Sequence, residues 1–306
     1  SRPFGSMTPG AAPERVSPGE PEEQEGTIIK TLYLVRHGEA LHNIEEKKAK
    51  QCAEAEAEAQ GFERGSLAFR AMTETARKSV LKDDQLKDAS LSESGKEEAC
   101  QAKAEIERLT AGKDGLPAPT GIYVSPLQRT LQTASIIFPG HPGTHIREFL
   151  RERRTGLPCD ERQPASALAK RASFVYMSHG GLAAFDTQDH CAVTEDSCKL
   201  RERTAVLAGV LRGMKDDVLC VVTHKGFLRE LERGPFNRPD ATEFRNCEVR
   251  VYDVELGAGD ELVATLRHGD GRSLTSAEAS CAKAQRDLAA CQTTARLDCI
   301  PGVPGC

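Results

Sequence analysis

The sequence contains no tryptophan, and aromatic residues make up only 5% of its 306 residues. No apolar run approaches the roughly 18 residues that a membrane-spanning helix needs, so no membrane partner is predicted. The net charge is −5 and no basic stripe with interleaved aromatic residues occurs, which argues against a nucleic-acid partner. With 39% hydrophobic and 28% charged residues, the composition is that of a globular protein with a full core.

Metal-ligand signatures are also missing. Neither Cys-x-x-Cys nor His-Glu-x-x-His occurs, so the sequence predicts no metal and no other cofactor. Eleven cysteines are scattered from Cys52 to Cys306, and their odd number and irregular spacing argue against a disulfide scaffold. A reducing, cytoplasmic location is therefore expected, and residues 1–26 lack the basic-then-apolar plan of a signal peptide. Ser1 stands ahead of Met7, so a longer N-terminus remains open.

Composition shifts divide the chain into three parts. Residues 1–26 are rich in Pro, Gly and Glu and are predicted to be disordered, because they hold too few apolar side chains to offset their ordering entropy. Residues 27–270 form the main domain, with a helical insertion at about 45–82 that is rich in Glu, Lys and Ala. This insertion is either a lid or a solvated helical hairpin, and the hairpin is favoured. Residues 271–306 form an Ala/Cys-rich tail, which is expected to be partly ordered with free thiols rather than a helix pair joined by a Cys281–Cys291 disulfide.

The main domain alternates between strand and helix patterns. Such alternation predicts an α/β fold, a three-layer α/β/α sandwich with a mostly parallel central sheet. Residues 247–256 and 261–266 read as a β-hairpin that closes the sheet and adds an antiparallel strand.

One buried strand ends in reactive side chains. The apolar run from Ile28 to Val35 is followed by Arg36-His37-Gly38-Glu39, and Asn43 lies six residues beyond the histidine. Ligands of open α/β sheets bind at the carboxyl ends of strands. Gly38 is expected to leave room there for a ligand, because it has no Cβ. The tripeptide recurs at Arg267-His268-Gly269, so it does not identify the site by itself.

Two later strands also end in candidate residues. Residues 121–124 read as a strand, after which Ser125 is predicted to cap a helix that carries Arg129 about one turn in. Residues 218–223 form the clearest buried strand and end in His224-Lys225-Gly226, where a helix begins. His179 also ends an apolar run and is the rival second histidine, but its strand pattern is weaker.

Two histidines and two arginines at one sheet edge suit a phosphoryl group. Arginine binds phosphate oxygens through two parallel hydrogen bonds, and the helix start near Gly226 adds N–H donors. Enough fixed positive charge removes the need for a metal. Neutral imidazole is a competent phosphoryl acceptor, and the leaving alkoxide then needs a general acid. Glu152 is the favoured acid and Glu148 is its rival.

The motifs together resemble those of the histidine phosphatase superfamily, also called phosphoglycerate-mutase-like. The matching stretches, in order, are Arg36-His-Gly-Glu39 with Asn43, Ser125-Pro-x-x-Arg129-Thr, Leu150-Arg-Glu152-Arg and Thr223-His224-x-Gly226. The stretches Cys159-Asp160-x-Arg162 and Phe244-Arg-Asn-Cys-Glu248 look like a eukaryotic, phosphatase-type branch. Lys225 departs from the family pattern, because small residues are common at that position.

The resemblance implies a role for each motif residue. His37 would be the nucleophile and form a phosphohistidine, and Glu152 would be the proton donor. Arg36, Arg129 and His224 would bind phosphate, with Asn43 at the pocket edge. His268 lies after the second motif and lacks the following Glu, so it is expected to play no part.

The function predicted on this basis is a metal-independent phosphomonoester hydrolase that acts on a phosphorylated small molecule. A phosphoglycerate mutase is an alternative, although the longer mutase pattern around Glu152 is absent, where Gly156-Leu-Pro-Cys stands instead. A non-catalytic module that binds a phosphorylated ligand is a second alternative. The substrate and the oligomeric state are not predicted.

Overall fold

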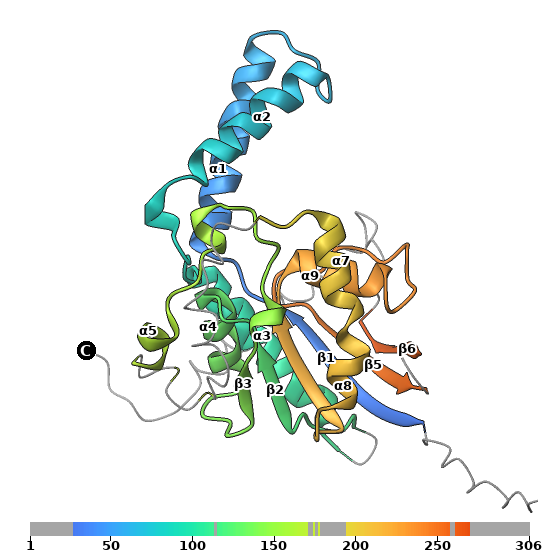
Figure 1. Cartoon of the computed structure of the whole chain (residues 1–306). Helices are drawn as coiled ribbons and strands as arrows, with labels where there is room; N and C mark the ends of the chain where they lie inside the picture. Colours follow the sequence, from blue (N-terminus) through green and yellow to red (C-terminus); the bar gives the residue numbers. More distant parts are fainter. Residues whose placement is uncertain are drawn as a thin grey trace, which may run out of the picture.

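The computed structural model describes residues 27–112, 115–170, 174, 177, 194–257 and 261–269. The segment predicted to be disordered, the Cys-rich tail and His179 lie outside these residues. Figure 1 shows a central sheet with helices on both faces and a helical hairpin that projects away from it.

The sheet has six strands in the order β3-β2-β4-β1-β5-β6. Their bounds are β1 (Ile28–Arg36), β2 (Gly121–Val124), β3 (Thr144–Ile146), β4 (Val218–Thr223), β5 (Val249–Leu256) and β6 (Leu262–His268). The first four strands in this order pair in parallel, and β5 pairs antiparallel with both β1 and β6. The predicted parallel sheet and its closing hairpin are confirmed.

The helices form a layer on each face of the sheet, and two of them form a hairpin that projects away from it (Figure 1). Their bounds are α1 (Leu41–Ala59), α2 (Leu67–Val80), α3 (Glu93–Thr110), α4 (Gln128–Ile137), α5 (Ala165–Ala169), α7 (Ser197–Ala205), α8 (Leu207–Arg212) and α9 (Lys225–Arg233). Short 3-10 turns lie at η1 (Asp84–Leu86), η2 (Glu148–Leu150) and η3 (Pro158–Asp160). Helices α7 and α8 follow one another directly, and Val206 caps both of them.

Alternate side chains of the strands feed two separate cores. Tyr33 and Val35 of β1 pack in a cluster with α3 and α4. Leu32 and Leu34 of the same strand pack in a second cluster with α7, α8 and α9. Because successive strand residues point to opposite faces, a strand that is apolar throughout needs cover on both sides. The three-layer arrangement follows from this pattern.

The hairpin of α1 and α2 is the predicted insertion. The two helices pack against each other, and Ser66 caps α2 by accepting a hydrogen bond from the Phe69 N–H at 3.2 Å. Figure 1 shows that the tip of the hairpin lies away from the sheet, while its base meets the sheet near the end of β1. No helix in the described ranges combines the length and the apolar character that crossing a membrane requires.

Strand register brings the motifs together. Arg36 pairs with Thr223, and Val124 pairs with Val222, so β1, β2 and β4 end level with one another. The residues that follow these strands therefore start at the same sheet edge.

Candidate active site

The two histidines that follow β1 and β4 lie side by side. The ring centroids of His37 and His224 are 5.1 Å apart, and both side chains are buried. The Ser125 hydroxyl, at the end of β2, lies 2.7 Å from His224 Nε2. The edge of the sheet at which β1, β2 and β4 end thus brings together the residues that directly follow these three parallel strands.

The expectation that Ser125 caps the next helix was wrong. Helix α4 begins at Gln128 with Leu127 as its N-cap residue, and Ser125 Oγ is only 3.5 Å from the Leu127 N–H. The hydroxyl is turned instead toward His224, a partner far away in sequence. Ser125 therefore orients a histidine rather than starting a helix.

The ring of His37 is held in one tautomer. Its Nδ1 lies 2.7 Å from the carbonyl oxygen of Gly38, and a carbonyl can only accept a hydrogen bond. Nδ1 therefore carries the hydrogen, and Nε2 keeps its lone pair. Burial lowers the pKa of His37 well below its usual value, and the charges of Arg129 and Arg36 lower it further. The ring is thus neutral and nucleophilic at Nε2 around pH 7.

The structural role of Gly38 differs from the one predicted. A Cβ at this position would lie 2.4 Å from the carbonyl oxygen of Gly95 in α3. The glycine therefore allows the loop after β1 to pack against α3, rather than making room for a ligand.

Each of the two predicted phosphate-binding arginines is held by one of the stretches noted in the sequence. Arg36 donates from Nη1 to the Phe244 carbonyl at 2.8 Å. Arg129 donates from Nη1 to the Cys159 carbonyl at 2.7 Å and from Nη2 to Asp160 Oδ1 at 3.2 Å. Within the described ranges, the Nε atoms of both arginines are buried without a hydrogen-bond partner. Each guanidinium is fixed in place while its Nε–H donor is left over.

Glu152 reaches the same cavity from the segment after η2. Its carboxylate accepts hydrogen bonds from the Arg153 N–H at 2.9 Å and from the Gly226 N–H at 3.3 Å. A Cβ at residue 226 would lie 2.3 Å from Glu152 Oε1, so any larger residue would displace this carboxylate from its present position. The Gly226 N–H, expected to face phosphate, is thus directed to Glu152.

The rival carboxylate is engaged elsewhere. Glu148 binds Arg151 Nη1 at 2.9 Å and Arg162 Nε at 2.8 Å, and it does not line the cavity. Of the two candidate acids, the fold brings only Glu152 to the histidines.

The base of the α1–α2 hairpin supplies side chains that the sequence analysis missed. His42 is buried, and its Nε2 lies 3.0 Å from Asn43 Nδ2, which can only donate. Glu46 of α1 forms an ion pair with Arg77 of α2. All four residues line the cavity, so the hairpin forms part of its wall. The one sequence signal was that His42 adjoins the predicted Asn43.

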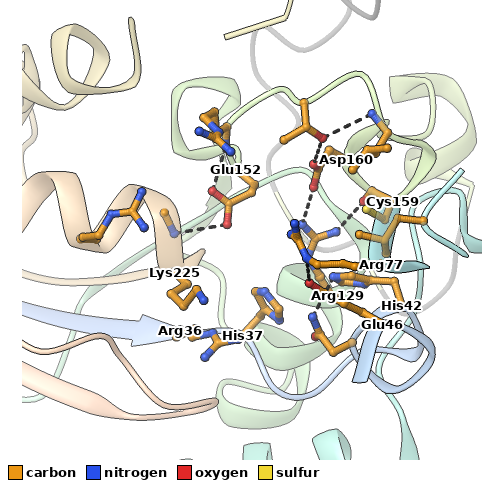
Figure 2. Close-up of a pocket in the computed structure, with 17 residues that line it drawn as sticks. Arg36, His37, His42, Glu46, Arg77, Arg129, Glu152, Cys159, Asp160 and Lys225 are labelled. Atoms are coloured by element: carbon orange, nitrogen blue, oxygen red, sulfur yellow. Dashed lines mark hydrogen bonds and ion pairs between the residues drawn. The ribbon is translucent and has the colours of Figure 1, made fainter. Parts of the chain in front are cut away.

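Figure 2 shows the residues that line the cavity, with Glu152 facing His37 across the open space. Its volume is about 240 Å³. The described residues that line it are Arg36, His37, His42, Asn43, Glu46, Arg77, Leu81, Arg129, Glu152, Arg153, Thr155, Leu157, Cys159, Asp160, Lys225, Gly226 and Arg229. Six of these side chains are cationic and three are carboxylates. The site thus carries excess positive charge in a chain that is negative as a whole.

The repeated tripeptide lies elsewhere. His268 ends β6, and its Nε2 lies 2.8 Å from Glu105 Oε1, outside the cavity that holds His37. In the part of the chain that the structure describes, no three His, Cys, Asp or Glu side chains gather as a metal site.

Comparison with known proteins connects this arrangement to a family. The family model of the histidine phosphatase superfamily (branch 1) matches residues 71–264, which include Arg129, Glu152 and His224 and begin beyond His37. The search of curated proteins found no match.

Three solved structures illustrate what the fold is similar to. A mycobacterial glucosyl-3-phosphoglycerate phosphatase with VO3 is 17% identical, with 78% of this chain and 97% of that chain covered and a TM-score of 0.43. A phosphoserine phosphatase from Entamoeba histolytica with 3-phosphoglyceric acid is 16% identical, with 79% and 98% covered and a TM-score of 0.41. A putative α-ribazole-5′-P phosphatase from Escherichia coli is 18% identical, with 80% and 100% covered and a TM-score of 0.44.

The family match covers more than half of the chain, and its residues include the second histidine, the buried arginine and the carboxylate of the cavity. The chain belongs to the histidine phosphatase superfamily.

Proposed function

We propose that this protein is a metal-independent phosphomonoester hydrolase that acts through a phosphohistidine on His37. The observation that carries the proposal is the contact of His37 Nδ1 with the Gly38 carbonyl, since it leaves the Nε2 lone pair free to attack phosphorus. In the first step the Nε2–P bond forms as the ester P–O bond breaks. Glu152 gives its proton to the leaving oxygen.

In the second step a water molecule attacks the phosphohistidine. Glu152, now ionised, accepts the proton of that water, and the N–P bond breaks to release inorganic phosphate and neutral His37. Glu152 suits both steps because two backbone N–H groups hold its carboxylate at the cavity. One residue thus serves as acid and then as base.

Binding of the phosphoryl group falls to the fixed cations. Arg36 and Arg129 offer their buried Nε donors, and Asn43 lies at the cavity wall. His224 is neutral, because burial and then the charge of Arg129 lower its pKa well below the usual value, and its Nδ1 is buried without a partner among the described residues. These preorganised groups stabilise the transferring phosphoryl group without a metal ion.

The test is hydrolysis of p-nitrophenyl phosphate in EDTA by the wild type, His37→Ala and His268→Ala. His268→Ala is a matched control, because it alters the same Arg-His-Gly tripeptide outside the cavity. We expect activity in the wild type and the control and none in His37→Ala. Labelling with a ³²P-phosphomonoester should give an acid-labile, base-stable phosphoenzyme. Undiminished activity in His37→Ala would refute the nucleophile, and isomerisation of 3-phosphoglycerate faster than phosphate release would show a mutase instead.

A further inference from the structure

The outer wall of the cavity carries a row of cations on helix α9. Lys225, Arg229 and Arg233 lie at successive i, i+4 positions and therefore share one face of the helix. All three approach Glu243, at 3.9, 3.4 and 4.0 Å respectively. One exposed carboxylate thus faces three positive charges, and the first two of these side chains also line the cavity.

Of the other four cations of the cavity, Arg153 donates from Nη1 to the Ser197 hydroxyl at 3.4 Å, and the remaining three are engaged elsewhere. Arg129 forms a buried ion pair with Asp160, and Arg77 pairs with Glu46. Arg36 lies beside His37, where the transferring phosphoryl group would bind. Apart from Arg153, the positive charge of the cavity that is left for a second anion therefore resides in Lys225 and Arg229.

Of these outer cations, Lys225 is held by the weakest contacts. Its side chain is 48% exposed, and its ion pair with Glu243 at 3.9 Å is long. Exposed ion pairs of this kind contribute little net free energy, so Glu243 competes weakly with an incoming anion. Arg229 is better held, because it also binds Glu230 at 3.1 Å. Figure 2 shows Lys225 and Arg36 on one side of the cavity, opposite Arg77, Arg129 and Asp160.

We propose that Lys225 and Arg229 form a second anion subsite, and that the substrate is a phosphomonoester bearing a further carboxylate or phosphate group. This inference rests on the proposed function for the placement of the first phosphate beside His37. The substrate would lie with its phosphoryl group at His37 and its second anion at the start of α9. A residue that directly follows the second histidine would then determine specificity.

The test compares ligands that differ only in the second anion. For the carboxylate arm the pair is 3-phosphoglycerate and glycerol 3-phosphate, which exchange a carboxylate for a hydroxymethyl group. For the phosphate arm the pair is 1,3-propanediol bisphosphate and 3-hydroxypropyl phosphate. Dissociation constants are measured by calorimetry in low salt on the full chain carrying His37→Ala, so that the ligands are not hydrolysed during the titration.

We expect the doubly anionic member of at least one pair to bind at least tenfold more tightly than its partner. Adding Lys225→Gln to this protein should reduce that ratio to threefold or less, and 0.5 M NaCl should do the same without the added substitution. Lys103→Gln is the matched control, because Lys103 is 39% exposed on α3 and pairs with Glu107 at 4.0 Å, away from the cavity. It should leave the ratio unchanged.

Two outcomes would overturn the subsite. One is equal affinity within both pairs, and the other is a preference that Lys225→Gln leaves intact. Failure of the proposed function looks different, because it would abolish the His37-dependent release of phosphate from p-nitrophenyl phosphate while leaving these affinity ratios measurable. The arm with the larger ratio identifies whether the second group is a carboxylate or a phosphate.

Discussion

The contact between Gly226 and Glu152 can be tested by adding one methyl group. In Gly226→Ala the new Cβ would lie 2.3 Å from Glu152 Oε1, whereas ordinary van der Waals contact begins at about 3.4 Å. The carboxylate must therefore move by roughly 1 Å, the difference between these two distances. The hydrogen bond from the Gly226 N–H, already 3.3 Å long, is lost in the process.

The expected cost follows from the role of the carboxylate. A displacement of about 1 Å at a catalytic group lowers the rate on the order of 10²-fold, and complete loss of a general acid lowers it by about 10²–10⁴-fold. We therefore expect kcat to fall by about 10²-fold on an alkyl phosphate. Stability should not fall, because the clashing atom ends a flexible side chain and alanine in a helix stabilises by up to about 1 kcal/mol relative to glycine.

The assay exploits the need of the leaving group for a proton. p-Nitrophenolate leaves without protonation, whereas an alkoxide does not. Gly226→Ala and Glu152→Gln should therefore lose much more activity on an alkyl phosphate, such as glycerol 3-phosphate, than on p-nitrophenyl phosphate. Gly209→Ala is the control, since that helical glycine has nothing within 4 Å of its Cβ position. Equal losses on the two substrates in Gly226→Ala, or a melting temperature lowered by several degrees, would refute the reasoning.

Two further predictions concern stability. Burial and nearby guanidinium groups lower the pKa values of His37, His42 and His224, so the unfolded chain takes up these protons first. Stability is therefore full above about pH 6.5 and falls below it, by about 1.4 kcal/mol per pH unit for each histidine, as urea unfolding between pH 7 and 5.5 should show. Glu232→Gln should lower the free energy of unfolding by about 3 kcal/mol, because it removes the buried carboxylate that pairs with Arg250 Nη1 at 2.7 Å.

Each of these predictions has a single-residue control. His42→Gln removes one titrating group and should reduce the loss between pH 7 and 5.5 by about a third, so an unchanged loss would contradict the assignment. Glu255→Gln changes an exposed carboxylate on the same strand as Arg250 and should alter the urea midpoint little. An equal effect of Glu232→Gln and Glu255→Gln would show that the buried pair contributes no more than a surface charge.

The local patterns of the sequence predicted the strands and the residues at their ends. The apolar runs that became β1 and β4 are buried on both faces, and such runs are readable without knowledge of the partner strands. Because parallel strands end at one sheet edge, the proximity of His37 and His224 also followed from the strand predictions. The wall formed by the hairpin could not be predicted, because the pairing of Glu46 with Arg77 depends on how α1 and α2 pack.

The sequence by itself determined the sheet, the two strand-end histidines and the excess of positive charge near them, because each depends on contiguous residues. Only the tertiary structure decided which groups complete the site. Thr223 donates to the Leu150 carbonyl at 2.6 Å and anchors the segment that delivers Glu152, while Glu148 is turned toward two arginines. Ser125 is likewise directed to His224 by strand pairing rather than by its neighbours. The Thr223–Leu150 and Ser125–His224 contacts join residues 73 and 99 positions apart, so they depend on the packed fold and no local pattern records them.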